Sequence, residues 1–149
     1  MVRPQRTVLH VDDDRSMLHL VRKRLECDGY QMISLEQPER LIETLLKHDC
    51  RVVLLDVQMP THNGLDLLSQ IKQYDGGIQV IMLTGLVSMN TVLESLRRGA
   101  EACLFKPVRQ FDDILHALST TFEKLDRWWE TLEELNERRC EQRETAPVR

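Results

Sequence analysis

The sequence lacks the features of several large protein classes. Aromatic residues make up 5% of the chain, and no apolar run approaches the roughly 20 residues that span a bilayer. The formal net charge of -4 argues against a general nucleic-acid binder, which normally presents a basic face. The N-terminus leads directly into strand-like sequence, without the apolar stretch of a signal peptide. These absences predict a cytoplasmic globular protein that binds neither nucleic acid nor membranes.

The four cysteines also lack an organised pattern. Cys27, Cys50, Cys103 and Cys140 are scattered and do not have the spacing of metal ligands. We interpret them as reduced thiols of a cytosolic protein. With 149 residues, 42% of them hydrophobic and 30% charged, the chain is about one domain long and can bury a real core.

Four short apolar runs each lead into a reactive polar residue. The runs are VLHV before Asp12, RVVLL before Asp56, VIML before Thr84 and ACLF before Lys106. With QMISL they predict five buried strands, and the amphipathic stretches that follow each strand predict helices. Five repeats of strand and helix predict an α/β protein with a parallel sheet and right-handed crossovers.

The strand ends predict a single site. The carboxyl ends of parallel strands lie along one edge of a sheet, so Asp12, Asp13 and Asp56 should converge there with Thr84 and Lys106. Three adjacent carboxylates repel one another unless a cation neutralises them, and hard oxygen ligands suit Mg²⁺. A metal, an ammonium and a hydroxyl together fit the oxygens of a phosphoryl group. Asp56, alone at the end of the central strand, is then the natural nucleophile.

At these motifs the chain resembles the response-regulator receiver domain of two-component signalling. The matching segments are VDDD (Val11–Asp14), LLDVQMPTHNGL (Leu54–Leu65), VIMLTG (Val80–Gly85) and GAEACLFKPV (Gly99–Val108). The resemblance covers roughly residues 6 to 122 in the expected order. It implies a flavodoxin-like, doubly wound sheet of five parallel strands in the order 2-1-3-4-5, with helices on both faces.

The resemblance also implies a role for each site residue. Asp56 would accept the phosphoryl group, and Asp13 and Asp56 would bind Mg²⁺ directly. Asp12 would act largely through water, and the carbonyl of Gln58 would be a further metal ligand.

Thr84 would bond the phosphoryl group, and Lys106 would pair with one of its oxygens. The Lys106-Pro107 peptide bond is similar to the cis-proline of the family. Gln58 and Leu86 would flank the approach of water and tune the lifetime of the acyl phosphate.

Two features depart from the family pattern. Receivers usually carry Tyr or Phe three residues before the lysine, where this chain has Cys103. Phe105 lies on the same side of the strand, and we hypothesise that it supplies the aromatic output surface. The alternative is that Phe105 merely packs against a neighbouring helix.

The second departure is the C-terminus. An a/d heptad pattern continues past the usual end of a receiver and comprises Phe111, Leu115, Leu118, Phe122, Leu125, Trp129, Leu132 and Asn136. We therefore divide the chain into a receiver domain at residues 1–122 and a helical extension at 123–149 that ends in a short disordered tail. The extension is interpreted as a coiled-coil homodimer element or a docking helix for a partner. The alternative is a last helix that overruns and frays.

The predicted function is that of a stand-alone response regulator without a DNA-binding output domain. Its phosphodonor would be a phosphohistidine on a sensor histidine kinase or a histidine phosphotransfer protein. The acyl phosphate would bias a two-state equilibrium that is reported by contact with an unknown downstream protein. The protein would catalyse only its own phosphoryl transfer and dephosphorylation.

Two alternatives remain at this point. A haloacid-dehalogenase-type phosphatase would use Asp12 of the Asp12-x-Asp14-x-Ser16 segment as nucleophile, with Asp112-Asp113 as late acids. That reading leaves Asp56 and the MPTHNG turn unexplained. The other alternative is an unphosphorylated scaffold that keeps the fold and acts through its C-terminal helix.

Overall fold

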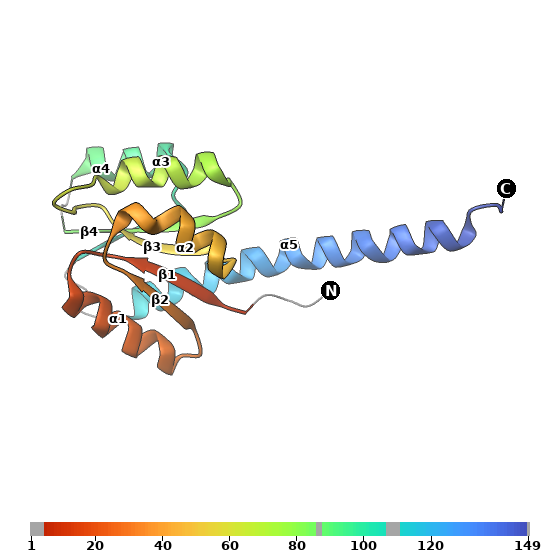
Figure 1. Ribbon diagram of the computed structural model, residues 1–149, viewed down its shortest axis with the longest axis horizontal. Coiled ribbons are helices and arrows are strands. Elements are labelled where there is room, and N and C mark those ends of the chain that lie inside the picture. Colours follow the sequence, from red (N-terminus) through yellow and green to blue (C-terminus); the bar gives the residue numbers. More distant parts are fainter. Residues whose placement is uncertain (1–4, 86–87, 107–110, 149) are drawn as a thin grey trace.

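The computed structural model describes residues 5–85, 88–106 and 111–148, in which strands and helices alternate (Figure 1). The elements are β1 (Thr7–Val11), α1 (Arg15–Cys27), β2 (Gln31–Leu35), α2 (Leu41–His48), β3 (Val52–Asp56), α3 (Gly64–Tyr74), β4 (Gln79–Thr84), α4 (Met89–Arg97), β5 (Ala102–Phe105) and α5 (Asp112–Thr145). The five predicted strands and the helix predicted after each strand are all present. Pro38, however, opens a single 3₁₀ turn that precedes α2.

Within the described residues the strands form one parallel sheet in the order β2-β1-β3-β4-β5, which confirms the predicted fold class. After β1 the chain moves outward to β2, and after β3 it moves outward in the opposite direction to β4. The carboxyl ends of β1 and β3 therefore diverge at a topological switch point, where α/β sheets bind their ligands.

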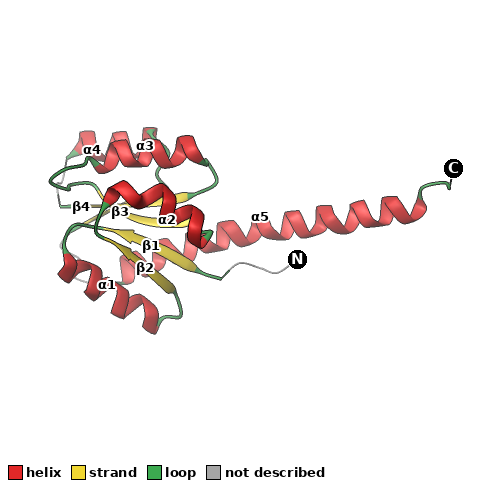
Figure 2. Ribbon diagram, viewed as in Figure 1, coloured by secondary structure: helices red, strands yellow, loops and turns green. Residues whose placement is uncertain are grey.

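Helices cover both faces of the sheet (Figure 2). Alternate strand residues point to opposite faces. Val8, Leu54 and Leu83 pack with side chains of α1 and α5. Leu9 and Val53 pack with side chains of α2 and α3 on the other face. The central strands are buried on both sides, as their unbroken aliphatic runs predict.

Side-chain caps fix the two helices that leave the central strand ends. Asp14 accepts hydrogen bonds from the backbone N–H groups of Ser16 and Met17 at the start of α1. Asn63 accepts one from Leu65 at the start of α3. Capping satisfies N–H groups that have no partner within a helix. Asp14 is therefore the N-cap of α1.

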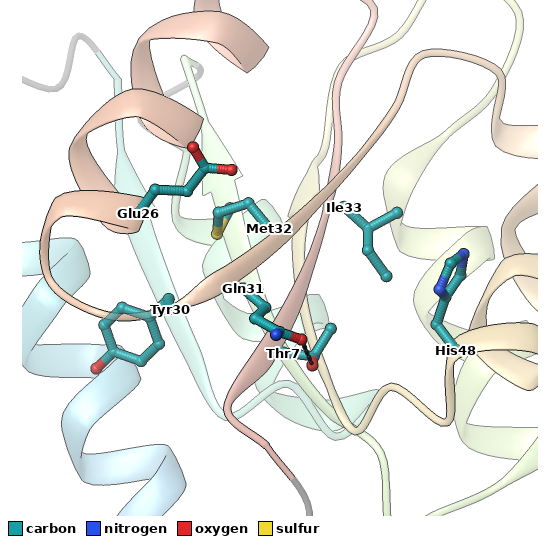
Figure 3. Close-up of a pocket in the computed structure, with 7 residues that line it drawn as sticks. All are labelled: Thr7, Glu26, Tyr30, Gln31, Met32, Ile33 and His48. Atoms are coloured by element: carbon teal, nitrogen blue, oxygen red, sulfur yellow. Dashed lines mark hydrogen bonds between the residues drawn. The ribbon is translucent and has the colours of Figure 1, made fainter.

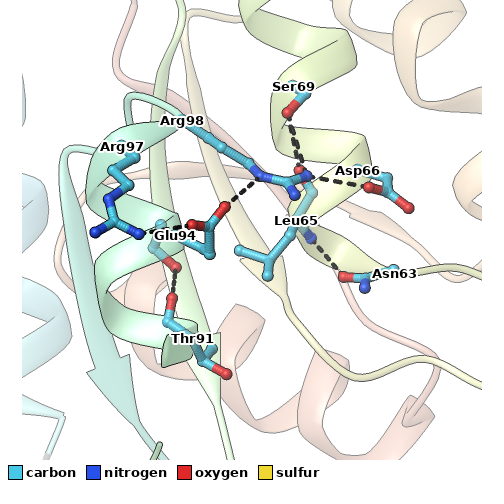
Figure 4. Close-up of polar contacts among 9 residues, drawn as sticks. Asn63, Leu65, Asp66, Ser69, Thr91, Glu94, Arg97 and Arg98 are labelled. Carbon is cyan, nitrogen blue, oxygen red and sulfur yellow. Dashed lines mark hydrogen bonds and ion pairs between the residues drawn. The ribbon is translucent and has the colours of Figure 1, made fainter. Parts of the chain in front are cut away.

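An arginine joins α4 to α3 (Figure 4). The guanidinium of Arg98 donates to Glu94 at 3.3 Å within its own helix region and to Asp66 of α3 at 3.0 Å. It also lies 3.5 Å from the hydroxyl of Ser69. Arg97, by contrast, contacts Glu94 alone among the interactions shown in Figure 4. Arg98 thus ties α4 to its neighbour.

α5 runs 34 residues and extends away from the sheet in its C-terminal half (Figure 1). It is continuous through residues 122 and 123, where the sequence places a domain boundary, and that boundary stays a prediction. Beyond the sheet edge the side chains of Trp128, Leu132 and Leu135 are 64%, 49% and 51% exposed.

No helix in the described part of the chain is both long and apolar enough to cross a membrane. Two sequence predictions fall outside the described ranges: the cis peptide bond before Pro107 and the position of Leu86.

Candidate functional site

Three carboxylates meet at the switch point between β1 and β3. Asp12 and Asp13 follow β1, and Asp56 is the last residue of β3. One carboxylate oxygen from each residue lies within 4.8 Å of the others. Asp12 and Asp56 are buried, whereas Asp13 is exposed. The predicted convergence of these three residues is present in the structure.

Lys106 approaches this cluster from the edge strand β5. Its Nζ atom lies 2.8 Å from Oδ2 of Asp12 and 3.4 Å from Oδ2 of Asp56. Its backbone N–H donates to the carbonyl of Thr84 at 2.7 Å. Thr84 is fully buried at the end of β4, which lies between β3 and β5. The fold therefore brings both Lys106 and Thr84 to the edge that carries Asp56.

The turn after β3 is held tightly against Asp56. The backbone N–H of Gln58 donates to Oδ1 of Asp56 at 3.2 Å, and Gln58 pairs with Asn63 across the turn. A Cβ atom at Gly64 would overlap the carbonyl oxygen of Asp56. This tight turn places the backbone of Gln58 beside Asp56. Metal binding by the Gln58 carbonyl stays a prediction.

The pKa values of the two buried carboxylates are shifted in opposite directions. Burial raises the pKa of Asp56 to about 6; Lys106 works against this rise and Asp12 adds to it. Burial also raises the pKa of Asp12, but hydrogen bonds from Lys106 and from the Asp14 N–H bring it below its ordinary value. Burial lowers the pKa of Lys106, yet its bond to Asp12 leaves that pKa raised overall. Asp56 is therefore the carboxylate that needs more positive charge.

The acidic cluster fits a divalent cation. Carboxylate oxygens are the ligands that Mg²⁺ prefers. Both oxygens of Asp12 are already engaged, by Lys106 and by the Asp14 N–H. Asp13 is exposed, and Asp56 resists ionisation without further positive charge. The donor set thus favours Asp13 and Asp56 for direct contact with an ion.

His10 is a neighbour of the site that the sequence predicts to be an incidental packing or surface group. Its side chain is fully buried in β1, with Nε2 3.8 Å from Oδ2 of Asp12. Neither ring nitrogen has a hydrogen-bond partner among the described residues. Burial lowers the pKa of His10 to about 4, with Asp12 raising it and Lys106 lowering it further. The signal was available, because a residue two positions before Asp12 faces the same side of the strand.

In β5, Cys103 occupies the position where receivers usually carry an aromatic ring, and Phe105 lies two residues further on. Cys103 is partly buried against the core shared with α2 and α3. Burial raises the pKa of its thiol, against a hydrogen bond with Ser95. Phe105 is 46% exposed and pairs in register with Thr84. An aromatic surface is therefore present beside Thr84, although the output role of Phe105 stays a prediction.

A hollow elsewhere on the molecule has fewer reactive side chains than the carboxylate cluster (Figure 3). It has a volume of about 350 Å³ and lies along the edge strand β2. Glu26 is the one carboxylate among its described lining residues, and the hydrogen bond drawn there joins Thr7 to Gln31 at 3.4 Å. Thr7 begins β1, so this hollow lies toward the opposite end of the strand from Asp12. The cluster of carboxylates remains the candidate site.

The sheet order and the carboxylate cluster at its switch point define a flavodoxin-like α/β protein with an acidic, lysine-containing site. The family described as the response regulator receiver domain matches residues 8–119. The chain therefore belongs to this family of two-component signalling proteins.

Individual relatives agree with this assignment. The chemotaxis protein CheY of Halobacterium salinarum is 29% identical over 112 residues, which cover 75% of this chain and 92% of that protein. A receiver domain from Clostridium thermocellum has a TM-score of 0.76 at 25% identity, covering 82% of this chain and 98% of that one. The beryllofluoride-activated NtrC4 receiver domain dimer also has a TM-score of 0.76, at 28% identity, covering 80% and 98%.

Proposed function

We propose that the protein accepts a phosphoryl group on Asp56 from a phosphohistidine of a sensor histidine kinase or a histidine phosphotransfer protein. A carboxylate oxygen of Asp56 attacks phosphorus and the P–N bond breaks, while the other nitrogen of the donor ring takes up a proton from water, so that the donor histidine leaves as a neutral imidazole. The product is an acyl phosphate. The observation that carries the proposal is Asp56 at the end of β3, with Lys106 Nζ 3.4 Å from its carboxylate inside an acidic cluster.

Asp56 suits the nucleophile better than the other two carboxylates. The burial that raises its pKa to about 6 makes its oxygens more basic than those of Asp12. Asp12 is committed to Lys106 and to the Asp14 N–H. Asp13 is exposed and suits a metal ligand in contact with water.

We further propose that Asp13 and Asp56 hold Mg²⁺ directly, with Asp12 acting through water and the Gln58 carbonyl as an additional ligand. Such an ion supplies positive charge to the phosphoryl oxygens. Lys106 would exchange part of its contact with Asp12 for a phosphoryl oxygen, and the hydroxyl of Thr84 would donate to another. Fixed donors aimed at these oxygens stabilise the transferring group.

The output of this chemistry is protein–protein contact. Phosphorylation biases an equilibrium between two conformations by adding charge and acceptor atoms at one point. The exposed ring of Phe105, in register with Thr84, offers a surface that can report the change. We propose that the protein catalyses only phosphoryl transfer and dephosphorylation at Asp56 itself. We also propose that it acts in the cytoplasm.

Acetyl phosphate with Mg²⁺, followed by intact-mass measurement, tests the proposal. We expect one phosphoryl adduct that disappears with Asp56→Ala and with chelation of Mg²⁺. Asp113→Ala is the matched control, because it removes an exposed acid at the start of α5 and should leave labelling unchanged.

Two other outcomes would reject the proposal. An adduct retained by Asp56→Ala but lost with Asp12→Ala would identify the phosphatase-type chemistry on Asp12. No adduct with acetyl phosphate or with a phosphorylated histidine donor would favour an unphosphorylated scaffold.

A further inference from the structure

One face of α5 first packs on the sheet and then continues into solvent. Leu118 and Phe122 are buried on the sheet, and Leu125 packs against the same core. Trp129 and Leu132 follow at spacings of four and three residues, so they lie on the same side of the helix. This continuous apolar face is called the α5 seam below.

A groove lies where the seam passes the amino edge of the sheet. It has a volume of about 610 Å³. The sheet side contributes Arg6 and Gln79, and α5 contributes Leu125, Trp128, Trp129 and Leu132. The charged residues of the lining are already paired: Asp126 with Arg6 at 3.1 Å and Asp49 with Arg51 at 3.6 Å. The groove therefore joins an aromatic wall to charges that balance one another.

The projecting part of α5 is poorly suited to stand alone. An isolated helix of this length is marginal in water, and like charges four residues apart destabilise it. From residue 126 onward five pairs of like charges have this spacing: Asp126 with Glu130, Glu130 with Glu134, Glu133 with Glu137, Glu137 with Glu141, and Arg139 with Arg143. The exposed Trp128, Leu132 and Leu135 add apolar area that a partner would cover.

We propose that a second copy of the chain covers this surface, with the two α5 helices antiparallel along their seams. In this register Trp129 faces Arg139 of the second copy, and Leu132 faces Asn136 of the second copy. The tip of each helix reaches the groove of the other molecule. The shared segment runs from residue 125 to residue 143, about 27 Å at 1.5 Å per residue. The proposal extends the contact-based output proposed above.

Packing on the sheet favours the antiparallel orientation. A parallel partner could follow the seam only from Leu125 onward, because Leu118 and Phe122 already pack on their own sheet. In an antiparallel pair the tip of the second helix lies beside the groove, and the two receiver domains are at opposite ends.

The charges along the seam select the same orientation. Beyond Leu132 the seam positions become polar and then cationic, at Asn136, Arg139 and Arg143. A parallel pair would set Arg139 against Arg139 of the second copy. An antiparallel pair places these guanidinium groups over the tryptophan-lined part of the partner, where cation–π contacts with Trp128 and Trp129 are favourable.

Disulfide mapping tests the orientation in the full-length protein. The variant carries Trp129→Cys and Arg139→Cys together with Cys140→Ser, because native Cys140 adjoins position 139. The two new thiols are about 15 Å apart along one helix, too far for a bond within the chain. After mild copper-phenanthroline oxidation we expect a covalent dimer whose peptides link position 129 to position 139. Links of 129 to 129 and 139 to 139 would overturn the proposal.

Sedimentation of the unmodified chain provides the second measurement. We expect a dimer that Leu132→Glu converts to a monomer. Thr131→Glu is the matched control, since it places the same charge next door but off the seam, and it should remain dimeric. A monomer at high concentration, or a dimer that survives Leu132→Glu, would overturn the proposal. Labelling of Asp56 by acetyl phosphate, measured on the same variants, reports separately on the proposed function.

Discussion

At the scale of single residues, the site depends on an imbalance between two buried carboxylates. Lys106 lies 2.8 Å from Asp12 and 3.4 Å from Asp56. The ammonium therefore compensates Asp12 more fully and leaves Asp56 short of positive charge. The folded protein carries this cost unless a cation adds positive charge at Asp56.

Replacing Asp56 by asparagine should stabilise the metal-free protein at pH 7.5. The pKa of Asp56 is about 6 in the folded state against an ordinary 3.8. The folded state therefore binds more protons between these two values, and its stability falls as pH rises through that window. Asp56→Asn removes this loss, and we expect a gain in unfolding free energy of about 1–3 kcal/mol.

Urea denaturation in EDTA at pH 7.5 and at pH 4 measures the effect. The gain should be largest at pH 7.5 and should shrink toward pH 4, where the wild-type carboxyl is mostly protonated. Mg²⁺ should stabilise the wild type more than the variant. A variant less stable than the wild type at pH 7.5 would contradict this account.

Sequence reasoning reached the site residues because strand ends share one edge. It could not rank the distances from Lys106 to its two carboxylates, since these depend on rotamers and on the twist of the sheet. It also treated His10 as incidental, although its burial 3.8 Å from Asp12 makes it part of the surroundings of the site. Burial of a polar ring is a property of the packed sheet, which periodicity alone does not supply.

At the scale of elements, α4 is attached to the domain through side-chain contacts that the spacing of its apolar residues does not predict. The contact of Arg98 with Asp66, 32 positions apart, depends on how α3 and α4 pack side by side. Such pairs are visible only after the fold is known.

Arg98→Ala should loosen α4 more than Arg97→Ala does. Arg98 bonds both Glu94 and Asp66 and so links two helices, whereas Arg97 bonds Glu94 in its own helix. We expect faster amide exchange across residues 89–97 in Arg98→Ala, measured by hydrogen–deuterium exchange with mass spectrometry. Equal protection of α4 in the two variants would show that the link to α3 does not hold the helix.

At the scale of the whole molecule, the receiver core is complete before α5 leaves the sheet. The last buried core residues of that helix are Leu118 and Phe122, and Leu125 packs against the same core where it lines the groove. The sequence predicted the overlong helix from its heptads. It could not predict the groove, because its shape depends on where α5 passes the sheet edge.

A chain ending after Arg127 should therefore keep its fold and its chemistry. We expect the unfolding free energy to change by no more than about 1 kcal/mol, since mostly exposed residues are removed. Labelling of Asp56 by acetyl phosphate should persist, while self-association should be lost. Circular dichroism melts, intact-mass measurement and sedimentation check the three expectations. An unfolded truncated chain would show that the extension belongs to the core.

The contact between Gly64 and the carbonyl of Asp56 has a consequence for how this protein can vary. Even a methyl group at position 64 would have to displace the backbone of Asp56 and Val57. In a saturation library selected for signalling, this position should be nearly invariant, although it supplies no side chain to the chemistry. The residues that position 64 can accept are thus limited by the need to keep the Asp56 carboxylate in place.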